Sequence, residues 1–346
     1  MTAALSSSRL RRAVGRAPLP PILFALLLFC VACGERQPQG TLAYVSNERD
    51  GSVTVIDTKT DRVVSTIQLG AVRARGVRLS PDGKILYVAL STQSGKLYED
   101  ADNHIAAIDT SSGQVTQKYE VGRDPEQLAV GNGGKLLYAS NEDAGTATVT
   151  DVETRRTIAT LVVGIEPEGV SISPDGRWVY VTAETSNTVS VIDTQKNEVV
   201  ASFTVASRPR DAAFSPDGTR AYITTEIGRT LEVVDTNSHT ISKTIHLPPA
   251  DSVKPMGVVV SRDGGRVYVA NGRGNTVSVV DAKSLEVVRT IPVGQRVWGL
   301  ALTPDGRKLY AANSLSNDVS VIDTTTDEVV ATVKAGDGPW GIAIKP

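Results

Sequence analysis

Residues 168–203 read EGVSISPDGRWVYVTAETSNTVSVIDTQKNEVVASF, and this stretch decides the fold. It holds four runs of five or six residues in which apolar and polar side chains alternate, the pattern of half-buried strands. Pro174-Asp175-Gly176 predicts a tight hairpin between the first two runs, because proline presets φ to about −65° and glycine accepts a positive φ. The stretch therefore predicts one four-stranded antiparallel unit.

The same unit recurs along the chain, and a tyrosine near the start of its second run marks each copy. Successive marker tyrosines are 43, 51, 42, 42, 46 and 42 residues apart: Tyr44, Tyr87, Tyr138, Tyr180, Tyr222, Tyr268 and Tyr310. The phrase Ile192-Asp193-Thr194 also recurs, and we expect its aspartate to accept hydrogen bonds from the turn that follows. A four-stranded antiparallel unit repeated seven times predicts an all-β, seven-bladed β-propeller over residues 41–346.

The two ends of the repeat predict how the ring of blades closes. The first copy begins at its second strand, Leu42–Ser46, without the innermost strand that precedes every other marker tyrosine. The chain ends with Trp340–Ile344, which has the pattern of that missing strand. We therefore expect one blade to be built by both ends of the chain, which pairs strand edges that would otherwise stay open.

Residues 1–33 have the features of a targeting segment and are set apart from the fold. A basic region with four arginines between Arg9 and Arg16 precedes an apolar run, Ile22–Ala32. That run is too short to cross a bilayer core of about 30 Å as a helix. The pattern predicts a signal peptide.

The end of this segment, Cys30-Val31-Ala32-Cys33-Gly34, resembles the lipobox of bacterial lipoproteins, with Cys30 in place of the usual leucine. The resemblance implies lipidation of Cys33, followed by a linker at residues 34–40. We therefore expect a lipoprotein in the bacterial periplasm or at the cell surface that meets the membrane only through its lipid anchor. The alternative is a plain signal peptide and a soluble secreted protein.

Charge and composition argue against several classes of function. Setting aside the four arginines of residues 1–32 leaves 32 basic and 38 acidic residues, the opposite of an electrostatic footprint for nucleic acid. Single-stranded nucleic acid remains a minor alternative, because charge and tryptophan stacking can grip it. The arginines concerned are Arg49, Arg73, Arg75, Arg208 and Arg210. The three histidines share no metal-ligand spacing, and no phosphate loop is present. We expect a monomer.

The repeated phrases resemble a known family. Tyr-Val-Ser/Thr-Asn, Val-Ile-Asp-Thr and Ser-Pro-Asp-Gly are similar to those of YVTN-type (YncE-like) propellers. Residues 163–169, 294–298 and 316–323 resemble the subgroup named for its association with catabolism dependent on pyrroloquinoline quinone (PQQ). The resemblance implies a seven-bladed propeller that accompanies a quinoprotein oxidation system. The architecture is also similar to that of propeller lactonases.

Strand direction predicts that the two faces of the propeller differ. The Pro-Asp-Gly and Asp-Thr turns fall on one face, which we call the uniform face because these turns are nearly identical. The loops after each marker tyrosine and those leading into each innermost strand fall on the other, which we call the variable face. Two insertions, residues 93–103 and 248–254, also lie there. Because loops on a rigid scaffold commonly carry function, we expect a protein partner or small molecule to bind the variable face.

One position at the start of each innermost strand should rim the central channel. Read around the ring, these rim residues are Trp340, Arg75, Glu126, Glu168, Arg210, Met256 and Trp298. The order predicts a polar arc, Arg-Glu-Glu-Arg, facing an apolar arc, Met-Trp-Trp. An aromatic wall with convergent charges is the usual form of a ligand pocket. The alternative is that the charges neutralise one another while the tryptophans plug the channel.

An acid also recurs on the variable face, four residues after the marker tyrosine, at Glu48, Glu142, Glu184 and Glu226. Clustered carboxylates can hold a hard cation such as Ca²⁺, or supply an acid and a base with separated pKa values. The alternative is that they only bond to nearby loop backbone.

Together these observations predict a non-catalytic, extracytoplasmic binding propeller with no cofactor except a possible divalent cation. The alternative is a lactonase-like hydrolase that uses Glu126, Glu168 and Glu184 with a divalent cation.

Overall fold

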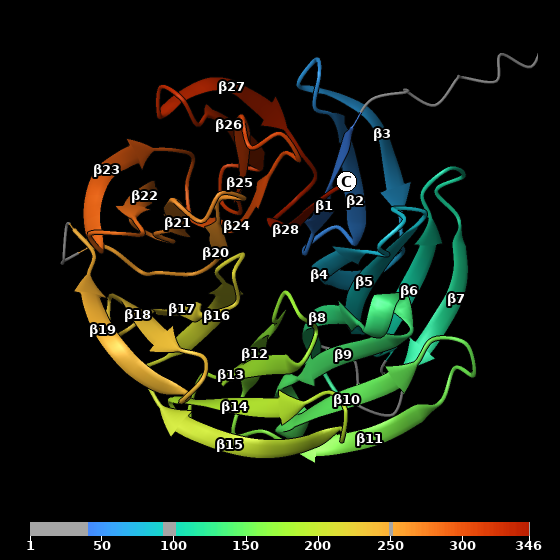
Figure 1. Cartoon of the computed structure of the whole chain (residues 1–346). Coiled ribbons are helices and arrows are strands. Elements are labelled where there is room, and N and C mark those ends of the chain that lie inside the picture. The colour runs from blue at the N-terminus through green and yellow to red at the C-terminus, as the bar shows by residue number, and fades with distance from the viewer. Residues whose placement is uncertain (1–40, 93–101, 249–251, 346) are drawn as a thin grey trace, which may run out of the picture. The chain divides into compact units, whose positions relative to one another are not determined.

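The computed structural model describes residues 41–92, 102–248 and 252–345. Within them, 28 strands form seven four-stranded antiparallel sheets arranged as blades around a central channel (Figure 1). The predicted seven-bladed propeller is confirmed. None of these described residues forms a helix long and apolar enough to cross a membrane. The predicted leader, Cys33 and the linker lie outside the described residues, as do residues 93–101 and 249–251 of the two insertions.

We number the blades in chain order and give their strands from the innermost to the outermost. Blade 1 is β28 (Pro339–Ile344), β1 (Leu42–Asn47), β2 (Ser52–Asp57) and β3 (Arg62–Gln68). Blade 2 is β4 (Val72–Leu79), β5 (Ile85–Thr92), β6 (His104–Asp109) and β7 (Val115–Glu120). Blade 3 is β8 (Pro125–Gly131), β9 (Leu136–Asn141), β10 (Thr146–Asp151) and β11 (Thr157–Val162), with short 3₁₀ turns η2 (Asn132–Gly134) and η3 (Glu142–Ala144).

The remaining four blades follow the same order. Blade 4 is β12 (Pro167–Ile172), β13 (Trp178–Ala183), β14 (Thr188–Asp193) and β15 (Glu198–Thr204). Blade 5 is β16 (Pro209–Phe214), β17 (Arg220–Thr225), β18 (Thr230–Asp235) and β19 (Thr240–His246). Blade 6 is β20 (Val258–Val260), β21 (Arg266–Ala270), β22 (Thr276–Asp281) and β23 (Glu286–Pro292). Blade 7 is β24 (Val297–Leu302), β25 (Lys308–Asn313), β26 (Asp318–Asp323) and β27 (Glu328–Lys334).

Blade 1 closes the ring, as the two ends of the repeat predict. Strand β28, near the end of the chain, pairs antiparallel with β1, so that Tyr44 lies opposite Ala343 and Val45 opposite Ile342. Figure 1 shows the two strands side by side where the first and last colours meet. This pairing covers the inner edge of β1, which would otherwise stay open.

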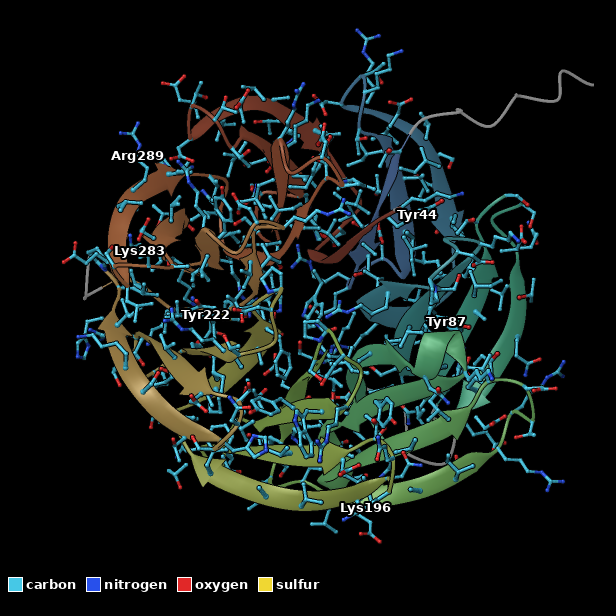
Figure 2. All side chains as sticks on the ribbon, viewed as in Figure 1. Tyr44, Tyr87, Lys196, Tyr222, Lys283 and Arg289 are labelled. Carbon is cyan, nitrogen blue, oxygen red and sulfur yellow. The ribbon has the colours of Figure 1, made fainter. Side chains whose placement is uncertain are left out.

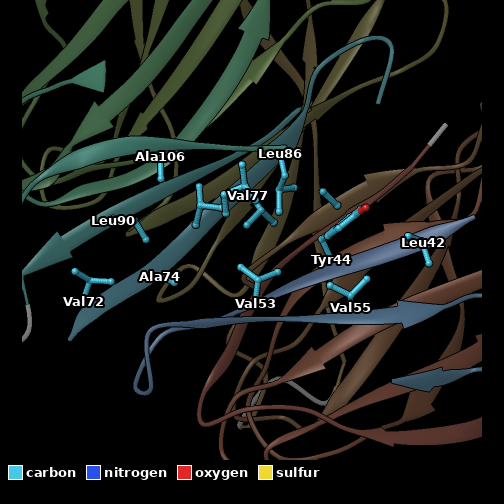
Figure 3. Close-up of a cluster of buried hydrophobic side chains, with 13 residues drawn as sticks. Leu42, Tyr44, Val53, Val55, Val72, Ala74, Val77, Leu86, Leu90 and Ala106 are labelled. Atoms are coloured by element: carbon cyan, nitrogen blue, oxygen red, sulfur yellow. The ribbon is translucent and has the colours of Figure 1, made fainter. Parts of the chain in front are cut away.

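The marker tyrosines recur because each one packs at the boundary between its own blade and the next. Tyr44 of blade 1 lies in an apolar cluster with Val72, Val77 and Leu86 of blade 2 (Figure 3). Each of the seven boundaries has such a cluster, and each cluster contains one marker tyrosine. In Figure 2 the labelled Tyr222 lies among the blades, whereas Arg289 points outward from β23. Removing a large aromatic ring from a core typically lowers the free energy of unfolding by about 3–5 kcal/mol. The regular spacing of the tyrosines in the sequence therefore reflects packing between blades.

Turns on the uniform face are held by their own side chains. In the Pro174 turn, Ser173 Oγ donates to Asp175 at 2.5 Å and accepts the Trp178 backbone N–H at 2.9 Å. Gly176 has a φ of 72°, which glycine adopts without steric cost. Asp193 Oδ1 accepts the backbone N–H of Gln195 at 2.9 Å, which confirms the predicted structural role of the Ile-Asp-Thr phrase. These turns are alike because local hydrogen bonding dictates them.

Candidate functional site

A β-bulge places the rim residue in six of the seven blades. In blade 4, the register between β12 and β13 shifts between Pro167 and Val170, so Glu168 and Gly169 lie in the bulge. The same shift occurs at the rim positions of blades 1, 2, 3, 5 and 7. Bulges turn a strand and re-aim its side chains. The repeated bulge therefore gives the rim side chains the same placement in these six blades, although the residue types differ.

The blades approach one another closely at the rim. A Cβ on Gly169 would lie 2.5 Å from the carbonyl oxygen of Arg210, so only glycine fits there. The Ser140 hydroxyl of blade 3 donates to the Glu168 carbonyl of blade 4 at 2.6 Å, and Thr182 donates in the same way to the Arg210 carbonyl at 3.1 Å. The signal for these bonds, a hydroxyl residue two places after the marker tyrosine, was not recognised from the sequence.

Five of the seven rim residues are buried, and Arg210 and Trp298 are partly buried. Arg75 lies at the centre of a first charged cluster. Its Nε donates to Glu48 Oε1 at 3.1 Å, and its Nη1 lies 3.1 Å from Asp124 Oδ1 and 3.6 Å from Glu142 Oε2. The same Nη1 contacts Glu126 Oε1. One guanidinium therefore joins carboxylates from blades 1 and 3.

A second charged cluster surrounds Arg210. Its Nε donates to Glu226 Oε2 at 2.7 Å, while its Nη1 forms ion pairs with Glu168 and Glu184. Arg208 lies alongside, with its Nε 3.1 Å from Glu226 Oε2 and its Nη2 paired with Glu184. The four charged rim residues and the four predicted loop acids thus belong to the same two clusters.

The apolar arc lies beside the second cluster. The rings of Trp298 and Trp340 are 5.6 Å apart between centroids and tilted by 32°. The guanidinium carbons of Arg296 and Arg210 lie 4.8 and 5.5 Å from the Trp298 ring centroid, within the range of cation–π attraction. Met256 packs in the same apolar cluster as Trp298. The polar and apolar arcs of the rim therefore adjoin, because Arg210 pairs with carboxylates and also lies against the Trp298 ring.

The sequence reading missed Asp124 and Arg296, and both enter the site for the same reason. Each lies two residues before a rim residue and has a left-handed backbone, with φ of 52° and 54°. Glu166 and Arg208 occupy the equivalent place with φ of 55° and 64°. Such a backbone costs a non-glycine residue roughly 1 kcal/mol or more. It also occurs in uniform-face turns, at Asn197 and Asp327, so it belongs to the repeat and does not by itself mark the site. A proline after three of these four residues, as in Asp124-Pro125, was the available signal.

Burial changes the acidity of two carboxyl groups in the clusters. Burial, together with the charge and hydrogen bond of Asp124, raises the pKa of Glu142 to about 7. Burial also raises the pKa of Glu168 well above its ordinary value, against the opposing charge of Arg210. A carboxyl group that titrates near neutral pH can exchange a proton under physiological conditions.

The arrangement does not assemble the predicted cation ligands into one site. Glu126 pairs with Arg75, whereas Glu168 and Glu184 pair with Arg210. A different set, Asp124, Glu126 and Glu142, has carboxylate oxygens that all lie within 4.8 Å of one another. Because Arg75 Nη1 already contacts all three, the chain supplies its own cation there.

The five arginines considered for nucleic acid are likewise engaged with carboxylates. Arg73 Nη2 lies 2.6 Å from Glu48 Oε1, and Arg49 Nη2 lies 2.7 Å from Asp337 Oδ1. Arg75, Arg208 and Arg210 belong to the clusters above. Around the two clusters, seven carboxylates face four arginines: Glu48, Asp124, Glu126, Glu142, Glu168, Glu184 and Glu226 against Arg73, Arg75, Arg208 and Arg210.

Comparisons with known proteins support the fold. Residues 193–341 match the family model described as "Lactonase, 7-bladed beta-propeller", and residues 45–207 match that of the choice-of-anchor I domain. No curated protein sequence matches the chain. Among solved structures, hydrazine synthase of Kuenenia stuttgartiensis is 24% identical with a TM-score of 0.70, covering 79% of this chain and 90% of that chain. A functionally unknown protein from Desulfotomaculum acetoxidans DSM 771 is 19% identical with a TM-score of 0.73, covering 88% and 99%.

Proposed function

We propose that this chain is a non-catalytic binding propeller that takes a protein partner on its variable face. One observation carries the proposal. Among the described residues, the large apolar side chains that are exposed outside strands are Ile165, Ile227 and Leu315, at 62%, 49% and 51% exposure. All three lie in variable-face loops, and the uniform face has no counterpart among the described loops.

The charged clusters indicate what such a partner would carry. Carboxylates and arginines lie together at the rim, so a partner that presents charged groups of both signs would complement it. Trp298 and the arginines beside it are residue types that dominate binding energy in protein interfaces. Apolar loop tips around such a centre match the usual composition of an interface.

The finer identity of the partner rests on the resemblance of the sequence phrases. Residues 163–169 and 316–323 support a YncE-like propeller that is accessory to a quinoprotein oxidation system. The lipobox-like Cys30–Gly34 supports a lipoprotein held at the outer side of a membrane. Replacing Cys33 with serine should release the protein from washed membranes. If the variant stays as firmly bound as the wild type, the lipid anchor is refuted while the binding proposal stands.

The partner is best sought by crosslinking and pull-down from the native membrane. A variant with Ile165, Ile227 and Leu315 all changed to serine should lose the crosslinked partner. The control changes Val63, Val200 and Val330 to serine, since these valines are similarly exposed at 43%, 43% and 54% on the outermost strands. If both variants recover the partner as the wild type does, the variable face is not the docking surface.

A lactonase-like hydrolase is the second candidate, favoured by the family match over residues 193–341 and by the pKa of about 7 at Glu142. Such an enzyme would need a bound divalent cation, whereas the binding proposal expects none. Elemental analysis of the purified protein and melting with Ca²⁺ or a chelator distinguish the two. A bound cation, a shift in melting temperature on chelation, or lactone hydrolysis that fails in Glu142→Gln would favour the enzyme.

A further inference from the structure

A cavity of about 580 Å³ occupies the central channel, separate from the rim. Its wall runs from Gln127 and Gly341, the residues directly after two rim positions, to Pro81 and Pro174 in the Pro-Asp-Gly turns. None of the seven rim residues lines it. The cavity is therefore a well that extends toward the uniform face, and its volume falls in the range of roughly 300–1,000 Å³ common for small-molecule sites.

Two opposite charges face this well from different blades. Arg78 is on β4 of blade 2 and Asp211 is on β16 of blade 5, three steps apart in a ring of seven. Arg78 forms no ion pair with a carboxylate of the described residues, and its Nη1 donates to the Val77 carbonyl at 2.8 Å. Asp211 Oδ1 and Oδ2 accept the backbone N–H groups of Ala212 at 2.9 Å and Val258 at 3.2 Å.

This separation of charges is costly without a ligand. A carboxylate and a guanidinium in a poorly hydrated site normally form a direct pair, because each otherwise loses hydration without compensation. Here the Asp211 carboxylate accepts backbone hydrogen bonds instead of a direct pair with Arg78. Burial raises the pKa of Asp211 to about 6 and lowers that of Arg78, while each charge favours the ionised form of the other.

The remainder of the wall presents polar and apolar surface together. Its apolar residues include Val258–Val260, Leu300–Leu302 and Ile342–Ile344 from blades 6, 7 and 1, and Leu79, Ile172 and Phe214 from blades 2, 4 and 5. Gln127 adds a polar group between the two charged blades, and its Oε1 is buried without a hydrogen-bond partner. A ligand with two opposite charges and a small apolar body would find a partner for each of these groups in the well.

We propose that the well binds a small zwitterion, an amino acid with an apolar body, whose carboxylate pairs with Arg78 and whose ammonium pairs with Asp211. A simple anion would meet the negative charge of Asp211, and a simple cation would meet Arg78. A ligand with both charges satisfies both residues. The site goes beyond the proposed partner on the variable face, since the two share no residue.

Isothermal titration of the full chain with L-leucine and with 6-aminohexanoate tests the proposal, because these zwitterions differ in charge separation. At least one should bind, and N-acetyl-leucine and leucinamide, which lack one charge each, should bind at least about tenfold more weakly. Arg78→Gln and Asp211→Asn should each weaken binding of the zwitterion by about tenfold or more, and asparagine keeps an acceptor for one of the two backbone N–H groups. Arg62→Gln on the exposed strand β3 is the matched control and should bind normally.

Two results would overturn the site. One is that neither zwitterion binds the wild-type chain at millimolar concentration. The other is that the singly charged analogues bind as well as the zwitterions, a measurement on the wild type that does not depend on whether a variant folds. The Ile165, Ile227 and Leu315 triple variant should keep zwitterion binding, so failure of the docking proposal and failure of the well are distinguishable.

Discussion

Replacing Arg210 with methionine should destabilise the propeller in a pH-dependent way. Arg210 pairs with Glu168, Glu184 and Glu226, and the side chains of the four residues are between 6% and 15% exposed. Methionine approximates the length of the arginine stem, so the main loss is the positive charge. The variant leaves Glu168 without a paired cation, while Glu184 and Glu226 keep only Arg208.

The size of the effect follows from this burial. Removing one partner of a buried ion pair typically costs about 3–5 kcal/mol, because the remaining charge is desolvated and unpaired. A domain of roughly 300 residues unfolds with an entropy of about 0.6 kcal/mol per kelvin, so the expected fall in melting temperature is about 5–8 °C at about pH 8. The folded-state pKa of Glu168 lies above its unfolded value, and losing Arg210 raises it further. Because protonation then removes the buried charge, the fall should shrink as the pH is lowered to about 5.

Thermal melting followed by circular dichroism at both pH values measures the effect. The control is Lys84→Met, which removes an ion pair with Asp82 at 3.4 Å whose side chains are 76% and 56% exposed. That pair should contribute at most about 1 kcal/mol. The reasoning is refuted if Arg210→Met melts like the control at about pH 8, or if its deficit grows on acidification.

Three further outcomes are expected. Affinity for the zwitterion should fall about tenfold from about pH 7 to pH 5, because Asp211 loses its charge below its pKa of about 6. Arg78, the other charged side chain that lines the well, does not titrate in this range. A calorimetric affinity that does not change with pH would contradict this. Deleting residues 339–346 should leave the inner edge of β1 unpaired and give aggregation by size-exclusion chromatography. A monomer with wild-type melting would argue against closure through β28. Ser140→Ala should cost about 1–3 kcal/mol in melting experiments, since it removes the bond to the Glu168 carbonyl and the acceptor of the Gln127 backbone N–H. Ser65→Ala on the exposed strand β3 should be neutral.

The fold was predictable because its signals are local and repeated. Each marker tyrosine fills one boundary between blades, so counting tyrosines counts boundaries. The half-unit at Leu42 and the extra strand at Trp340 together predicted the closing blade. The hairpin turns were equally predictable, since Ser173 and Asp175 supply the hydrogen bonds of their turn without distant residues.

The site was predictable only in part. The order of rim residues around the channel follows from chain order, so Glu168 and Arg210 had to be neighbours. Which acid pairs with which arginine depends on the left-handed loop residues, and Asp124 was missed for that reason. The charges of the well were missed because Arg78 and Asp211 occupy ordinary strand positions, and only the ring brings them to one cavity.

The polar half of the rim has no evident role in closing the ring. Blades 6, 7 and 1 fill the same structural position with Met256, Trp298 and Trp340, so the fold accepts apolar residues there. Replacing a buried ion pair with well-packed apolar residues is often neutral or stabilising. Apolar side chains in place of Arg75, Arg210 and their carboxylates would therefore stabilise the fold about as well. Their place at the centre of the face with exposed apolar loop tips is the physical reason to look for a partner there.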